Sequence, residues 1–129
     1  MTGNKCLLDT SIIIHSFKKK NDVGEKLDSI EEIYVPVIVV GELHYGIYKS
    51  ADPYRHLAQV KSFLSNCRIL SADFDTADIY GNIKATLTKK GKPIPENDIW
   101  IAAFAQQYNL PLYTKDKHFS EILTIALFD

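Results

Sequence analysis

Short β-favouring segments alternate with longer helical segments along this chain, and this alternation limits its fold more than any other feature. We expect strands at residues 5–8, 33–35, 68–70 and 110–114, and residues 124–128 would add a fifth. Strands that alternate with helices form βαβ units, in which the strands are parallel and helices cover both faces of the sheet. The sequence therefore predicts an α/β fold, a three-layer α/β/α sandwich with a central parallel sheet of four to five strands.

The stretches between these strands carry helix signals. Pro36 suits the first turn of a helix at 37–48, and Gly91 is typical of a helix end. The helix expected at 98–108 is apolar on nearly every side, so we expect it to be buried. Helices are thus predicted at residues 12–17, 37–48, 73–90 and 98–108, with a short one ending near residue 30 and another starting at residues 52–53.

Length and composition favour one soluble domain. The chain has 129 residues, 46% of them hydrophobic and 24% charged, which predicts a single globular domain over residues 1–129. The longest apolar run, residues 33–40, is shorter than the roughly 20 residues of a membrane span. Residues 1–5 lack a signal-peptide pattern, and Cys6 and Cys67 lack metal-type spacing. We therefore expect reduced thiols, no membrane partner and a cytoplasmic location.

Two carboxylates in the first part of the chain need an explanation. Asp9 ends the first strand, where open parallel sheets bind ligands, although it would also suit the N-cap of the next helix. Glu42 has apolar or small neighbours at helical spacing, so we expect it to point inward, where a carboxylate needs a cation or a hydrogen-bond donor. The alternative is that Glu42 turns outward towards Lys49 or His44.

Two further carboxylates stand in comparable positions later in the chain. Asp98 opens the most apolar helix, where a carboxylate also stabilises the helix dipole. Asp116 follows the strand at 110–114, where a polar turn residue is common. Each of these acids, taken alone, has an ordinary structural explanation.

Taken together, the four carboxylates predict a metal site, because all of them can meet at one edge of the sheet. Clustered carboxylates either raise their pKa values or bind divalent cations, and oxygen ligands favour Mg²⁺ or Mn²⁺ over zinc. Such a site holds one ion, or two about 3.5–4 Å apart, and activates water to hydrolyse a phosphodiester. The hydroxyls beside these acids, which would orient carboxylates or water, belong to Thr10, Ser11 and Thr114.

Four segments around these acids resemble, in order, the motifs of PIN-domain ribonucleases. A Gly-x-x-Ile loop from Gly91 to Ile94 precedes the third of them. The resemblance runs from about residue 7 to residue 119, and the order of the motifs is more specific than any one of them. The segments are 7–13 around Asp9, 36–46 around Glu42, 97–103 around Asp98 and 114–119 around Asp116.

Within that superfamily, the short single-domain length is similar to that of the VapC toxins of type II toxin–antitoxin systems. The resemblance implies an endoribonuclease that depends on Mg²⁺ or Mn²⁺, forms a homodimer and is inhibited by a small antitoxin whose tail blocks the acidic cleft. It also implies structured RNA targets, such as tRNA anticodon loops or a ribosomal RNA loop. By motif position, the catalytic and metal-binding residues would be Asp9, Glu42, Asp98 and Asp116.

This chain departs from the family pattern at two positions. Many members carry a further acid just before the Phe of the last motif, where this chain has His118. Relatives often have a His inside the third-motif helix, where this chain has Phe104. Both differences concern groups around the central acids and leave the role of His118 open.

The net charge of −1, from 15 basic and 16 acidic residues, argues at first against nucleic-acid binding. If four acids are metal ligands, however, the rest of the surface carries more basic than acidic residues, and an RNA substrate agrees with the charge. Lysines at helix ends more often only face solvent. The lysines that would contact an RNA backbone are Lys18, Lys89, Lys92 and Lys115.

Two other functions compete with the metal-dependent nuclease. The first is a non-catalytic module that docks an antitoxin and acts with it on operator DNA, although the presence of all four acids argues against a decayed site. The second is a phosphatase with Asp9 as nucleophile. Such enzymes typically place a second Asp two residues later, where this chain has Ser11.

Overall fold

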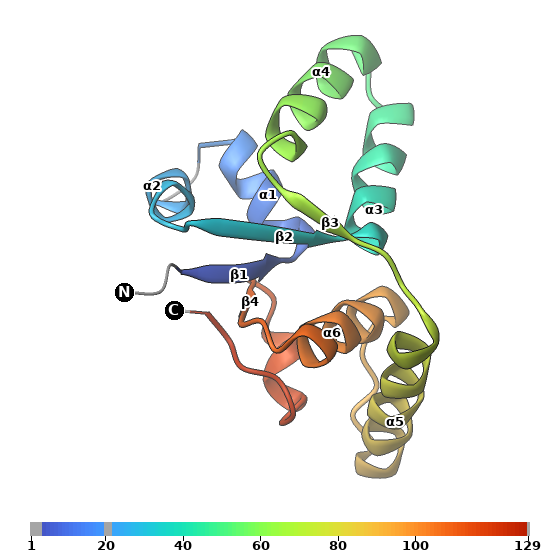
Figure 1. The fold of residues 1–129 in the computed structure, drawn as a ribbon. Helices are drawn as coiled ribbons and strands as arrows, with labels where there is room; N and C mark the ends of the chain where they lie inside the picture. The colour runs from blue at the N-terminus through green and yellow to red at the C-terminus, as the bar shows by residue number, and fades with distance from the viewer. Residues whose placement is uncertain (1–3, 20–21, 129) are drawn as a thin grey trace.

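A parallel four-stranded sheet lies at the centre of the computed structural model, which describes residues 4–19 and 22–128 (Figure 1). The strands are β1 (Lys5–Leu8), β2 (Glu32–Pro36), β3 (Arg68–Leu70) and β4 (Leu112–Tyr113). They pair in the order β3-β2-β1-β4, and every pair is parallel. The predicted α/β fold with a central parallel sheet is confirmed.

Pairs of helices connect successive strands and cover the sheet on both faces. The first four helices lie on one side of the sheet and the last two on the other (Figure 1). The chain moves outward from β1 to β3 and then returns past β1 to β4, so right-handed crossovers place the last helix pair on the opposite face. The helices are α1 (Thr10–Phe17), α2 (Val23–Asp28), α3 (Val37–Tyr48), α4 (Pro53–Leu64), α5 (Phe74–Lys90) and α6 (Glu96–Tyr108).

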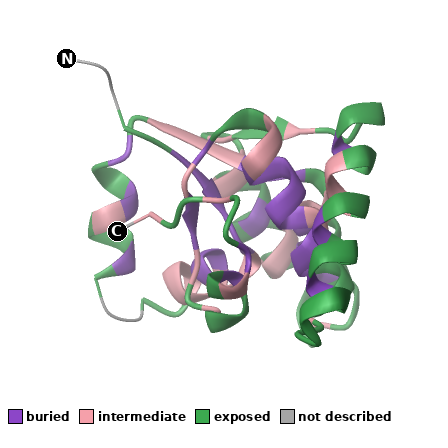
Figure 2. Cartoon of the chain, turned by 90° about the horizontal axis from the view of Figure 1, so that it is seen from below, coloured by how far each residue is buried: buried purple, intermediate pink, exposed green. Residues whose placement is uncertain are grey.

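The core lies between the helices and the sheet (Figure 2). Leu7 and Leu8 of β1 are fully buried because β1 is flanked by strands on both sides and by helices on both faces. The prediction that the helix at 98–108 is buried is confirmed, and Phe104 belongs to this core. The buried apolar residues of α6 are Ile99, Ile101, Ala102, Ala103, Phe104 and Ala105.

Three predicted element boundaries were wrong. α1 begins at Thr10 rather than residue 12, and α6 begins at Glu96, so that Asp98 lies inside its first turn. β4 is shorter than the predicted strand at 110–114 because its first residues have other roles. The Leu110 N–H donates to the Ala105 carbonyl at the end of α6, and Pro111 has no N–H to offer.

The predicted strand at 124–128 forms only an isolated parallel bridge between Leu112 and Leu127. The Leu112 N–H donates to the Ala126 carbonyl at 2.9 Å, and the Phe128 N–H donates to the Leu112 carbonyl at 2.8 Å. Because β4 has only two residues, it gives the last segment little to pair with. Before that segment lies a short 3₁₀ helix, η1 (Lys117–Glu121), which the sequence patterns did not predict.

Three further expectations concern membranes, thiols and the N-terminus. None of the helices in the described part of the chain is long and apolar enough to cross a membrane. Both thiols are free, as expected, and burial raises the pKa of Cys6 to about 12 and that of Cys67 to about 11. The interpretation of residues 1–5 rests partly on residues 1–3, which lie outside the described residues.

Candidate active site

Asp9 lies at the carboxyl end of β1 and is 5% exposed. Its Oδ2 atom accepts hydrogen bonds from the Ser11 hydroxyl at 2.9 Å and from the Thr114 hydroxyl at 2.7 Å. Asp9 occupies the N-cap position of α1, but its side chain makes no capping hydrogen bond to the described residues of that helix. The carboxylate is therefore held towards the end of β4 and is not used to start the helix.

The segment after β4 brings Asp116 to the same edge of the sheet. The Asp116 backbone N–H donates to the Thr114 hydroxyl at 2.9 Å, so Thr114 links the Asp9 carboxylate to the backbone of Asp116. The Lys115 N–H donates to the Ser11 hydroxyl at 3.2 Å, which joins the turn to α1. Two predicted hydroxyl residues, Ser11 and Thr114, thus hold the carboxyl ends of β1 and β4 together.

Glu42 of α3 points towards the start of α1 and α6. Its Oε1 accepts a hydrogen bond from the Thr10 hydroxyl at 2.5 Å, and its Oε2 accepts one from the Asn97 amide at 3.4 Å. The alternative in which Glu42 turns outward towards Lys49 or His44 is wrong, because both of its carboxylate oxygens are engaged at the start of α1 and α6. The sequence patterns did not predict a role for Asn97 at the site. Its position next to Asp98 was the only signal that could have indicated one.

Asp98 lies in the first turn of α6 and is 9% exposed. Burial raises the pKa of its carboxyl to about 6, with further contributions from the negative charges of Asp9, Asp116 and Glu42 and an opposing one from His118. The other three predicted acids are therefore close enough to act electrostatically on Asp98. Among residues 4–19 and 22–128, no side chain donates a hydrogen bond to the Asp98 carboxylate and no cation pairs with it.

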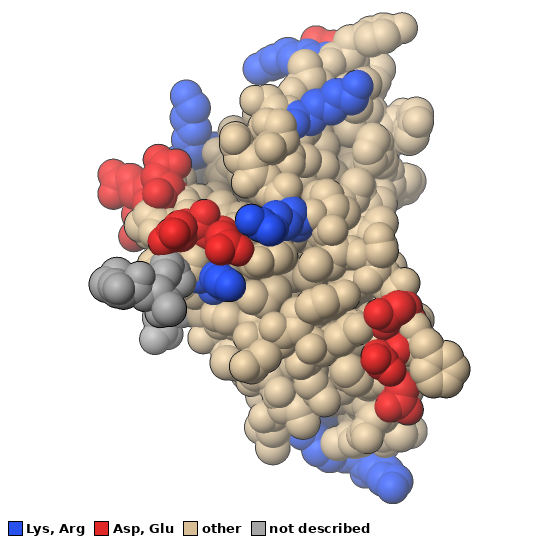
Figure 3. Space-filling model, in the orientation of Figure 1, with Lys and Arg blue, Asp and Glu red and all other residues tan. Residues whose placement is uncertain are grey.

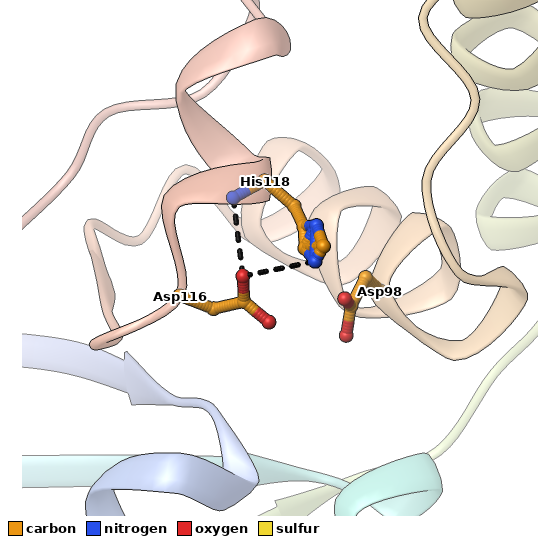
Figure 4. A group of neighbouring side chains, drawn as sticks. All are labelled: Asp98, Asp116 and His118. Atoms are coloured by element: carbon orange, nitrogen blue, oxygen red, sulfur yellow. Dashed lines mark hydrogen bonds and ion pairs between the residues drawn. The ribbon is translucent and has the colours of Figure 1, made fainter.

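Asp98, Asp116 and His118 form a group that fits a metal ion. One ligand atom from each lies within 4.8 Å of the other two (Figure 4). The His118 Nε2 atom is 3.3 Å from Asp116 Oδ1, and the His118 N–H donates to the same oxygen at 3.1 Å. Carboxylate oxygens and imidazole nitrogens are both common ligands of divalent cations. A cation here would also stabilise the buried Asp98 carboxylate, which forms no ion pair among the described residues.

The four predicted lysines do not form one surface. Lys115 lies next to the acids, in the turn between β4 and η1. Lys18 caps the carboxyl end of α1, whereas Lys89 and Lys92 lie at or just after the end of α5. Basic side chains gather over that end of α5 in the lower part of the molecule (Figure 3). Among the four, Lys115 is the one whose backbone N–H bonds Ser11, which in turn bonds the Asp9 carboxylate.

Comparison with known proteins decides the family. Residues 6–123 match the model of the PIN domain. Ribonuclease VapC2 of Haemophilus influenzae is 37% identical to the chain over 124 residues, which cover 94% of each protein. The chain belongs to the VapC family of PIN-domain ribonucleases.

Two further VapC relatives cover almost the whole chain. A protein of Salmonella typhimurium named tRNA(fMet)-specific endonuclease VapC is 33% identical over 97% of both chains. The crystal structure of VapBC2 from Rickettsia felis bound to a DNA fragment from their promoter contains a chain with a TM-score of 0.90 and 28% identity, over 96% of this chain and 97% of that one. These comparisons support a nuclease and favour neither the non-catalytic module nor the aspartyl phosphatase.

Proposed function

We propose that residues 1–129 of this VapC-family ribonuclease form one PIN-like nuclease domain that hydrolyses RNA phosphodiester bonds with Mg²⁺ or Mn²⁺. The observation that carries the proposal is the buried Asp98 carboxylate, which lies near Asp9, Asp116 and Glu42, is only partly compensated by His118 and forms no ion pair among the described side chains. A site with this excess of negative charge can bind RNA phosphates only if cations neutralise it.

In the proposed mechanism, Asp98 and Asp116 hold the cation, and Asp9 and Glu42 complete the acidic site. When bound, a divalent cation would lower the pKa of a water molecule and stabilise the charge on the phosphate. Ser11 and Thr114 restrict the Asp9 carboxylate through Oδ2, which leaves Oδ1 without a donor among the described side chains and able to accept a proton from water. Thr10 and Asn97 hold the Glu42 carboxylate differently, by donating to one oxygen each.

We further propose a structured RNA substrate, either a tRNA or a ribosomal RNA loop. The Salmonella typhimurium relative named as specific for tRNA(fMet) supports the first of these. In this proposal Lys115, whose backbone N–H bonds the Ser11 hydroxyl beside Asp9, would contact the RNA backbone next to the scissile bond, and Lys18, Lys89 and Lys92 would contact it farther away.

The proposed partners are a small cognate antitoxin and a second copy of the chain. The Rickettsia felis relative was solved as a VapBC2 complex on promoter DNA, which supports an antitoxin partner for this chain as well. We propose that this toxin–antitoxin pair acts in the cytoplasm, where its RNA substrates are found.

The test is cleavage of purified tRNA and ribosomal RNA by the full chain in Mg²⁺, in Mn²⁺ and in EDTA. We expect cleavage with either ion, none in EDTA, and none by the Asp98→Asn variant. Asp78→Asn, which changes an exposed acid of α5, is the matched control and is expected to cleave normally. Cleavage in EDTA would exclude the metal mechanism, and a phosphorylated Asp9 would favour the phosphatase.

A further inference from the structure

His118 is the one member of the group of three possible ligands that is not a carboxylate. It lies in η1, which places it beside Asp116 and Asp98. Its imidazole lies between the Asp116 and Asp98 carboxylates (Figure 4). The question is whether the ring only neutralises charge or takes part in binding the cation proposed above.

The distances fit a shared ion. Ligand atoms lie about 2.0–2.2 Å from Mg²⁺ or a transition metal, so adjacent ligands of one ion are about 3 Å apart and opposite ones about 4.2 Å apart. The His118 Nε2 atom is 3.3 Å from Asp116 Oδ1, close to the separation of adjacent ligands. The Asp98 atom of the group lies within 4.8 Å of both, so a small movement brings it into the same coordination sphere.

The backbone positions both ligands in advance. The His118 N–H donates to Asp116 Oδ1 at 3.1 Å, and the Asp116 N–H donates to the Thr114 hydroxyl at 2.9 Å. The Phe119 side chain next to His118 is fully buried and anchors η1 to the core. The short segment from Thr114 to Phe119 is therefore fixed at both ends, which holds the backbone of His118 beside Asp116, while its side chain stays 42% exposed and open to an incoming ion.

We propose that His118 is a nitrogen ligand of the cation at this site and biases it towards Mn²⁺ over Mg²⁺. The inference rests on the proposed function, since it concerns the same ion. Mg²⁺ is a hard cation that prefers oxygen ligands, whereas imidazole is a better ligand for transition metals. The other two ligands of the group, Asp98 and Asp116, offer oxygen atoms, so His118 would determine the metal preference of this site.

The test uses Mn²⁺ bound to the full chain and measures electron spin echo modulation by ligand nitrogen. We expect modulation typical of imidazole ¹⁴N in the wild-type protein and its loss in His118→Gln. His56→Gln, which changes a histidine of α4, is the control and should keep the signal. In competition between the two ions, His118→Asp is expected to lower the preference for Mn²⁺ about 10-fold, the scale of changes around metal ligands.

The outcomes separate this inference from the proposed function. Nitrogen modulation that persists in a folded His118→Gln protein, or is absent from Mn²⁺-loaded wild type, would overturn the role of His118. If RNA cleavage nevertheless requires a divalent ion, the proposed function stands. If the wild-type chain binds no Mn²⁺ and cleaves no RNA with any ion, both proposals fail. His118→Asp controls for misfolding of His118→Gln, because it keeps a metal ligand at this position. We expect it to bind Mn²⁺ but to show no imidazole nitrogen modulation.

Discussion

Glu96 and Asp98 lie two residues apart in the first turn of α6, yet their carboxylates have opposite environments. Glu96 is exposed, accepts a hydrogen bond from the Tyr80 hydroxyl and pairs with the Lys84 ammonium at 2.9 Å. These partners lower the pKa of Glu96. Asp98 is buried among other carboxylates, and its pKa is raised to about 6. The same helix dipole acts on both, so the tertiary neighbours decide which carboxylate is stable as an anion.

The largest expected difference between the two positions is in catalysis. Asp98→Asn removes a proposed metal ligand and is expected to lower the RNA cleavage rate by about 10³-fold or more, equal to roughly 4 kcal/mol of transition-state stabilisation. Glu96→Gln should change the rate by less than about 3-fold, because it breaks only an exposed pair. Single-turnover cleavage assays measure both, and equal losses would contradict the distinction.

The second prediction concerns stability of the metal-free protein. Because folding raises the pKa of Asp98 to about 6, the proton on Asp98 favours the folded state below about pH 4, and this contribution disappears as the pH rises through 6. At pH 7.5, Asp98→Asn should therefore stabilise the metal-free protein by about 2–3 kcal/mol, and at pH 4 it should not. Thermal unfolding in EDTA at both pH values measures this.

Glu96→Gln is the contrasting variant in the same experiment. The lowered pKa of Glu96 means that its ionised form favours folding above the ordinary pKa of 4.5, and that this contribution is lost as the pH falls through the lower folded value. The substitution should therefore destabilise the protein at pH 7.5 and have less effect in acid. A shift of the same sign for both variants would show that burial does not separate the two carboxylates.

A third prediction concerns the hydroxyl that links Asp9 to Asp116. Thr114→Val keeps the shape of the side chain but removes the hydroxyl that donates to the Asp9 carboxylate and accepts from the Asp116 backbone N–H. We expect about 10-fold or more loss of Mn²⁺ affinity, and Thr114→Ser should restore it. Calorimetric titration with Mn²⁺ measures both variants, and unchanged affinity in Thr114→Val would show that this link does not organise the site.

The smallest effect is expected at the lysines. Lys115→Ala should weaken RNA binding a few-fold at low salt, and the difference should shrink as the salt concentration rises. Lys89→Ala, at the end of α5, is expected to have a smaller effect because that lysine is not linked to the acids. Both lysine substitutions are made in the Asp98→Asn protein, which is expected not to cleave the RNA. RNA binding is then measured at several salt concentrations.

Much of the fold was predictable because its signals are local. The apolar stretch around α6, the glycine at the end of α5 and the β-favouring runs of β1 to β3 each depend on neighbouring residues. Errors occurred where a local pattern was overruled by distant groups. The predicted strand at 124–128 is reduced to one bridge, and the predicted strand at 110–114 is shortened because Leu110 pairs with α6.

The candidate site also has features that local sequence predicts and features that depend on distant residues. The sequence by itself determined which acids stand at strand ends and helix starts, because those positions follow from local periodicity and order along the chain. Only the tertiary structure decided how they are paired. Thr114 binds Asp9 across 105 residues and Thr10 binds Glu42 across 32, because the strand order places β4 beside β1 and α3 beside α1. Strand order depends on the packing of the whole core, and so does the burial of Asp98, whose carboxylate has no hydrogen-bond donor or paired cation among the described residues, while Glu96 has both Tyr80 and Lys84.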